Sequence, residues 1–171
     1  MPDAVFDALI SYSRQDQEFV RRLSAALQTR HIRTWVDWEG IPLSSKWLAE
    51  IEAQIEAANT FVFVVSPDSV ASEICRAEIR HAAAYRKKII PIVSRSVDPN
   101  TTPAEIVEWQ WLFFREQDDF DSACDDLAEA MTAFAGPAGP LFGVSVPVAP
   151  VRCAAGVPVA LPRAVAWAVG G

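Results

Sequence analysis

Short apolar runs alternate along the chain with longer stretches of mixed polarity. Four runs consist mainly of apolar residues, as is typical of buried strands, and lie at 5–11, 61–65, 89–93 and 109–114. Residues 32–36 alternate between apolar and polar side chains instead. This alternation predicts a half-exposed strand at the edge of a sheet.

The stretches between these runs carry apolar residues at helical spacing. Ser13 and Asp16 have the spacing of a capping box before the first helix, which we expect to end near Arg30. Thr102, Pro103 and Glu105 form a similar start for a short helix. The other predicted helix starts are Ser44 or Ser45, Ser69 or Ser72, and Asp119.

Strands and helices alternate through five strands, which predicts an α/β fold with a parallel sheet and helices on both faces. The half-exposed second strand and the fully apolar third strand favour the strand order 2-1-3-4-5. Pro91 lies within the predicted fourth strand, where it cannot donate a hydrogen bond. We therefore expect Pro91 at a bulge or near the end of that strand.

The composition changes near residue 135. The remaining 135–171 segment is rich in Pro, Gly, Ala and Val, and only Arg152 and Arg163 carry charge. Its prolines exclude one regular helix. We predict one domain over residues 1–134 followed by a tail or linker over 135–171, which is a linker, a terminal extension or the beginning of a further region.

The net charge of −7 argues against free nucleic acid as a partner. No charge-free apolar run reaches the length that spans a membrane, and the first residues lack the pattern of a signal peptide. The three cysteines are scattered, without the spacing of a zinc site. We expect a cytoplasmic protein with no metal, no disulfide framework and no membrane partner.

Ligands of open parallel sheets bind beyond the carboxyl ends of the strands, at the point where the strand order reverses. The segments expected there are 11–14, 66–68 and the 38–47 loop, which are rich in hydroxyl, charged and tryptophan side chains. Glycine-rich phosphate loops and the Gly-x-Ser-x-Gly elbow of hydrolases are absent from the sequence. A response-regulator receiver is disfavoured, because the third strand ends in Val65-Ser66 rather than in a phosphoacceptor aspartate.

Four segments, in order, resemble the characteristic motifs of the TIR (Toll/interleukin-1 receptor) domain family. Phe6–Ser13 resembles the first box of that family, and 35–45 resembles its second strand and BB loop. Phe61–Ser69 resembles the third strand and its exit. Ser72–Ile79 resembles the helix that carries the catalytic glutamate of the NAD⁺-cleaving members. The resemblance spans roughly residues 4 to 134 and implies a flavodoxin-like three-layer fold.

The resemblance implies an NAD⁺ glycohydrolase of the bacterial type, which releases nicotinamide and forms ADP-ribose or a cyclic isomer. Such a domain would act as an immune or toxic effector that self-association through TIR–TIR contacts activates. NAD⁺ would be its substrate, so no cofactor is expected, and a sensor domain or partner protein is left open. The alternative is a TIR–TIR signalling scaffold without enzymatic activity.

By position in these motifs, Glu78 corresponds to the catalytic glutamate. Many family members have Trp-Cys where this chain has Ile74-Cys75, so Trp38 or Trp47 would have to supply the aromatic ring that stacks on nicotinamide. Without the resemblance, we would interpret Glu78 as a surface acid near His81. The residues expected at the substrate are Ser11, Tyr12, Arg14, Asp37, Trp38, Trp47, Ser66 and Ile74.

The chemistry that the resemblance implies needs only one carboxyl group. Nicotinamide leaves the cation NAD⁺ as a neutral molecule, so its departure requires no general acid, whereas ordinary glycosidases use two carboxyl groups. A single carboxylate can stabilise the positive charge that develops on the ribose and can hydrogen-bond the ribose hydroxyls. Glu78 is the residue to which we assign this role by resemblance.

Overall fold

The computed structural model describes residues 6–38 and 45–133, with the backbone alone for 45–47. Five parallel strands form one sheet in the order β2-β1-β3-β4-β5, which confirms the predicted fold class and strand order. The predicted tail at 135–171 lies outside the described residues. The strands are β1 (Ala8–Ser11), β2 (Thr34–Trp35), β3 (Thr60–Val65), β4 (Lys88–Val93) and β5 (Leu112–Phe113).

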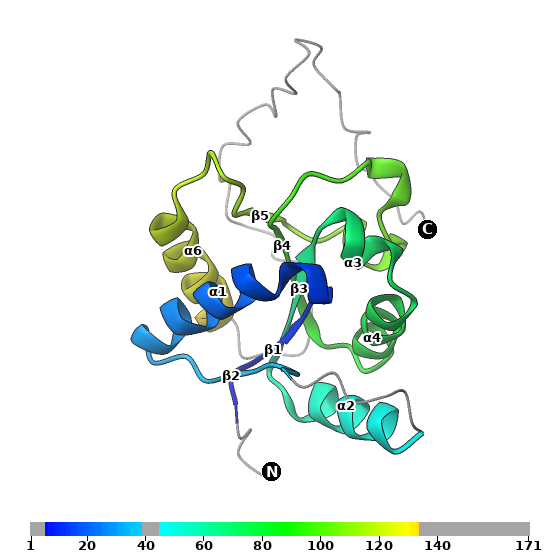
Figure 1. Cartoon of the computed structure of the whole chain (residues 1–171). Helices are drawn as coiled ribbons and strands as arrows, with labels where there is room; N and C mark the ends of the chain where they lie inside the picture. The colour runs from blue at the N-terminus through cyan, green and yellow to red at the C-terminus, as the bar shows by residue number, and fades with distance from the viewer. Residues whose placement is uncertain (1–5, 39–44, 134–171) are drawn as a thin grey trace, which may run out of the picture. The chain divides into compact units, whose positions relative to one another are not determined.

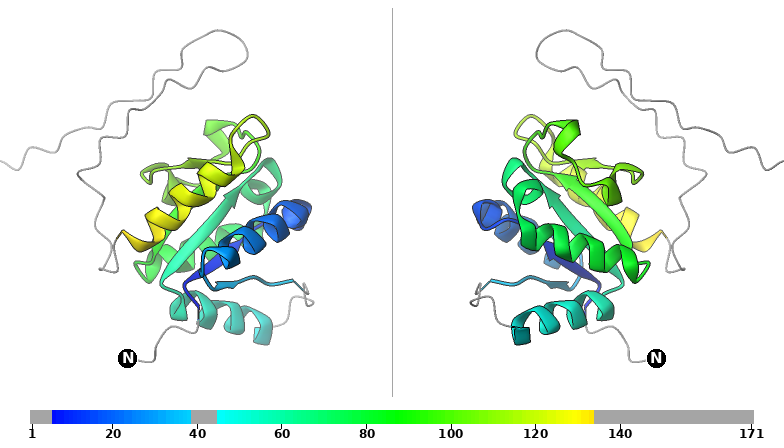
Figure 2. Two further views of the ribbon diagram at one scale, coloured as in Figure 1. Left: turned by 90° about the vertical axis from the view of Figure 1, so that its left-hand side faces the viewer. Right: turned by 90° about the vertical axis from the view of Figure 1, so that its right-hand side faces the viewer.

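Helices cover both faces of this sheet, with α1 and α6 on one face and α2 and α4 on the other (Figures 1 and 2). Within the described residues, no helix combines the length and the apolar character that a bilayer crossing needs. The helices are η1 (Arg14–Asp16), α1 (Gln17–Thr29), α2 (Ser45–Ala57), α3 (Pro67–Ala71), α4 (Glu73–Ala84), η2 (Pro99–Thr101), α5 (Ala104–Val107) and α6 (Phe120–Thr132).

The alternation of side chains along the strands divides the core into two clusters. Leu9 of β1 and Phe61 and Phe63 of β3 belong to the cluster that α2 and α4 cover. Ile10 and Val62, one position along, belong to the cluster beneath α1 and α6. Because Ser11 follows Leu9 by two residues, this pleat also turns Ser11 toward the α4 face.

Several predicted boundaries differ from the structure. The last strand was predicted at 109–114, but β5 comprises only Leu112–Phe113. Just before it, the Trp111 Nε1 donates to the Ile106 carbonyl at 2.8 Å. The predicted bulge at Pro91 is absent, since β4 continues through Pro91 in unbroken register with β3, and Pro91 lies two residues before the end of β4. On the other side, β5 pairs only with Ile92 and Val93, so no β5 residue lies opposite Pro91.

Two predicted capping boxes are also wrong. Ser13 caps η1 by accepting from the Gln15 backbone, and α1 begins without a side-chain cap. The short helix α5 begins after Pro103 with no side-chain cap, while Asp98 caps η2 just before it. By contrast, Asp119 caps α6 as predicted, accepting from the Ser122 backbone.

Asp16, expected to be the acid of a capping box that starts at Ser13, is a buried residue that joins the carboxyl ends of three strands. Its carboxylate accepts from the Ser66 Oγ at 2.5 Å and from the Arg95 Nη2 at 2.8 Å. Arg95 also donates to Asp68 at 2.6 Å. Ser66 follows β3 and Arg95 follows β4, so this network stabilises the edge of the sheet at which a ligand site is expected.

We expect Asp16→Ala to lower the free energy of unfolding by about 3 kcal/mol, because it leaves the fully buried Ser66 hydroxyl and part of the Arg95 guanidinium without an acceptor. Asp125→Ala is the matched control. It removes an aspartate that also pairs with an arginine, Arg30, but whose side chain is 71% exposed, and it should cost less than about 1 kcal/mol. Urea unfolding of both variants measures the difference, and equal losses would contradict the structural role of Asp16.

Candidate functional site

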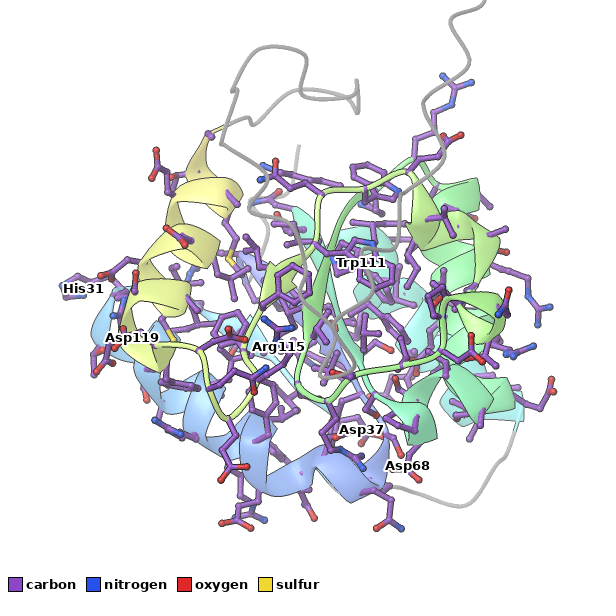
Figure 3. All side chains as sticks on the ribbon, turned by 90° about the horizontal axis from the view of Figure 1, so that it is seen from above. His31, Asp37, Asp68, Trp111, Arg115 and Asp119 are labelled. Carbon is purple, nitrogen blue, oxygen red and sulfur yellow. The ribbon has the colours of Figure 1, made fainter. Side chains whose placement is uncertain are left out.

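A hollow of about 180 Å³ lies where β1 ends, on the α4 side of the sheet. Figure 3 shows Asp37 and Asp68, which follow β2 and β3, toward this same edge of the sheet, beside the start of α1. The hollow is therefore at the switch point between β1 and β3, where the topology predicts ligand binding. Its lining includes Leu9, Ser11, Tyr12, Ser13, Arg14, Trp35, Asp37, Ser72, Ile74, Cys75 and Glu78.

Glu78 of α4 and Ser11 of β1 meet inside this hollow. The Ser11 Oγ donates to the Glu78 Oε2 at 2.5 Å. Helical spacing explains the position of Glu78, because Cys75 and Ile79 are buried on the inner face of α4 and Glu78 lies at the border of that face. Ser72 caps α4 and accepts from the Cys75 backbone, so the first turn of α4 is anchored beside the hollow.

The environment of Glu78 raises the pKa of its carboxyl group from 4.5 to about 7. Burial is the largest cause, because it disfavours the charged form, and the negative charge of Asp37 acts in the same direction. The hydrogen bond from Ser11 and the charge of Arg14 oppose the shift. A carboxyl group with a pKa near 7, half-buried in a hollow, is typical of a functional site.

Tyr12 and Arg14 hold the chain where it leaves β2. The Tyr12 hydroxyl donates to the Asp37 carbonyl at 2.9 Å. The Arg14 Nη1 donates to the Asp37 and Trp38 carbonyls at 2.9 and 3.0 Å, and its Nη2 pairs with the Asp37 carboxylate at 2.8 Å. These residues therefore border the hollow while they anchor the start of the segment that follows Trp38.

The structure brings together five of the eight residues predicted to contact the substrate. Ser11, Tyr12, Arg14, Asp37 and Ile74 line the hollow beside Glu78.

The other three lie elsewhere or are not described. Trp38 is 38% exposed and contacts the Tyr12 ring, without lining the hollow. Ser66 is fully buried, caps α3 and donates to Asp16, so it is outside the hollow as well. The side chain of Trp47 lies outside the described residues.

Trp35 and Cys75 line the hollow but were not among the predicted site residues. Trp35 lies on the alternating strand 32–36, and its pairing opposite Leu9 on the neighbouring strand brings it to the hollow. Cys75 is buried, and burial raises the pKa of its thiol to about 11, so the thiol stays protonated near neutral pH. The sequence signal for Trp35 was the alternation of the second strand. It indicated that one face of this strand is exposed, but not that this face borders a hollow.

The alternative interpretation of Glu78 as a partner of His81 does not describe this structure. The His81 Nε2 lies 3.0 Å from the Glu56 Oε1, and its Nδ1 lies 3.8 Å from the Glu52 Oε1, so His81 pairs with α2. Within the described ranges, no three His, Cys, Asp or Glu side chains are grouped closely enough to hold a metal ion.

Comparisons with known proteins agree with this architecture. The sequence model of the TIR domain matches residues 9–128, and the chain matches no curated protein sequence. Among solved structures, the TIR domain of the Toll-related receptor TRR-2 from Hydra magnipapillata is 25% identical, with a TM-score of 0.63 over 74% of this chain and 98% of that one.

Two further structures share the fold at lower identity. A metazoan TIR-STING receptor from C. gigas in complex with 2',3'-cGAMP is 19% identical, with a TM-score of 0.60 over 77% of this chain and 40% of that one. The RPS4 and RRS1 TIR domain heterodimer is 15% identical, with a TM-score of 0.55 over 72% of this chain and 93% of that one.

The fold and the hollow define a doubly wound α/β domain with a carboxyl group at its switch point. The family model covers more than half of the chain, and this chain belongs to the TIR domain family.

Because the pKa of Glu78 is raised, the folded chain holds a proton that the unfolded chain releases between about pH 4.5 and 7. The free energy of unfolding therefore falls as the pH rises through this window. Glu78→Gln removes the titrating group, so its stability relative to the native chain should increase by on the order of 2 kcal/mol between pH 4.5 and pH 8. Urea unfolding at both pH values, with the exposed Glu73→Gln as control, measures this change. A difference independent of pH would contradict it.

Proposed function

We propose that this TIR domain cleaves the nicotinamide–ribose bond of NAD⁺, with Glu78 as the catalytic carboxylate. The observation that carries the proposal is the position of Glu78, half-buried in a hollow at the switch point and hydrogen-bonded by Ser11. When the C–N bond breaks, its electron pair passes to the nicotinamide nitrogen and positive charge develops on the ribose. An ionised Glu78 beside the ribose stabilises that charge.

The size of the hollow suggests that only one part of the substrate binds inside it. Sites that enclose a whole drug-sized ligand measure about 300–1,000 Å³, whereas this hollow measures about 180 Å³. It is suited to the nicotinamide and its ribose, with the rest of the dinucleotide outside. Water as the acceptor gives ADP-ribose and one proton, and an internal nucleophile of the substrate gives a cyclic isomer. Loss of NAD⁺ is the output through which the domain would act as an immune or toxic effector.

We expect Glu78→Gln to abolish release of nicotinamide from NAD⁺, with a loss of at least about 100-fold, because the amide cannot carry the negative charge that stabilises the ribose cation. Glu73→Gln, on the exposed face of the same helix, should keep full activity. Nicotinamide released by the purified proteins is quantified by liquid chromatography.

The pH profile of the native chain gives a second test of the catalytic role of Glu78. With a pKa of about 7, kcat/KM should rise about tenfold between pH 6 and pH 8, because this ratio reports ionisation of the free enzyme. Full turnover by Glu78→Gln, or no turnover by the native chain at any concentration, would overturn the proposal and favour a non-enzymatic scaffold.

We further propose that self-association through TIR–TIR contacts activates the domain. Trp38 and Leu48 are exposed large apolar side chains, 38% and 42% accessible. They flank a segment that includes Ile41 and Leu43, residues that lie outside the described ranges. We infer that Trp38 and Leu48 belong to one contact surface, because contiguous exposed apolar patches mark protein–protein contacts.

Specific activity should therefore fall several-fold when the protein is diluted below the concentration at which it associates. Leu48→Lys should give the low value at every concentration, because a charge at the contact opposes association. Val107→Lys, which alters a 58% exposed apolar residue on α5, is the control and should behave as the native chain. Activity assays run in parallel with sedimentation velocity test this, and a monomer with full, concentration-independent activity would contradict it.

A further inference from the structure

Trp35 is an aromatic residue that lines the hollow in which Glu78 lies. It is paired with Leu9 in the register of β1 and β2, at the edge of the sheet. Its ring centroid lies 6.4 Å from that of Phe6, and it packs against the core cluster beneath α2 and α4. Trp35 is only partly buried and lines the hollow, together with Ile74 and Glu78.

Two other described aromatic residues, Tyr12 and Trp38, lie near this site, and of these only Tyr12 also lines the hollow. The Tyr12 hydroxyl donates to the Asp37 carbonyl, and its ring contacts the ring of Trp38 at a centroid distance of 6.2 Å. Trp38 itself lies against the Arg21 guanidinium, 5.4 Å from the ring centroid, and does not line the hollow. Among the described residues, Trp35 is therefore the tryptophan that a ligand in this hollow would meet.

We propose that Trp35 is the base-recognition residue of this site and that it selects a positively charged pyridinium ring. The inference rests on the proposed function for the identity of the ligand, NAD⁺. The face of an indole ring is electron-rich and attracts cations. Nicotinamide carries a positive charge while it is joined to the ribose, whereas its reduced form in NADH is neutral. A ring bound against Trp35 thus places its ribose toward Glu78, which lines the same hollow.

The same contact favours departure of the product. Cleavage leaves the electron pair of the C–N bond on the nicotinamide nitrogen, so the released ring is neutral. Its attraction to the Trp35 face is then reduced to stacking and apolar contact. Ile74 lines the same hollow and adds apolar contact but no aromatic face. Recognition therefore depends on charge as well as shape, and the charge disappears in the reaction.

The test compares NAD⁺ with NADH in the full chain that carries Glu78→Gln, so that NAD⁺ is not consumed and the carboxylate does not contribute to charge selectivity. Isothermal titration calorimetry should show NAD⁺ binding about tenfold more tightly than NADH. Adding Trp35→Leu should reduce this ratio to within about twofold, because leucine keeps apolar contact but has no π face. Adding Trp35→Phe should retain a ratio of intermediate size. Since both ligands bind the same acidic protein, the change of the ratio with residue 35 isolates the effect of the ring.

Trp109→Leu is the matched control, because Trp109 packs against the same core cluster but does not line the hollow. It should leave the ratio at about tenfold, which separates recognition from general loss of packing. A ratio that Trp35→Leu and Trp35→Phe leave unchanged overturns the inference, even where the native chain releases nicotinamide. The expected ratios in a chain that releases no nicotinamide would support recognition by Trp35 and refute the proposed catalysis.

Discussion

The carboxyl group of Glu78 is held partly out of water at the point where β1 ends beneath α4. Burial and the charge of Asp37 favour its protonated form, while the Ser11 hydroxyl donates to it and favours the charged form. The balance gives a pKa of about 7, so the group changes charge within the physiological range. The geometry of the site depends on this contact, because it joins a strand end to a helix that are 67 residues apart in the chain.

Such a contact persists only if the strand ends and the helix keep their positions. The buried carboxylate of Asp16 provides part of that rigidity by accepting from Ser66 after β3 and from Arg95 after β4. On the helix side, Ser72 caps the first turn of α4, and two residues of that turn, Ile74 and Cys75, pack in the core. The raised pKa of Glu78 opposes folding at neutral pH, so these surrounding interactions offset the unfavourable desolvation of the site.

A feature could be predicted from the sequence when the residues that determine it lie close together along the chain. Strand order was predictable, and Ser72 was one of two predicted caps of α4, because apolar periodicity and capping chemistry are local signals. The sequence analysis did not predict the separate helix α3. Its start is a reciprocal cap between Ser66 and Ser69, and the sequence pattern of this short segment is typical of a loop. Ser66 and Asp16 were assigned other roles because their contact joins residues 50 positions apart. Trp35 was overlooked for the same reason, as no local pattern shows that one face of β2 opens on a hollow.

The first box of the domain joins the site to the segment that follows β2. Ser11 contacts Glu78, and three residues later Arg14 donates to the Asp37 and Trp38 carbonyls. Asp37 in turn raises the pKa of Glu78 through its charge, while Arg14 lowers it. Any displacement of residues 37 and 38 would therefore change both the lining of the hollow and the ionisation of Glu78. The proposed association at the exposed Trp38 would thus have a direct electrostatic route to the carboxyl group, without a change in the sheet.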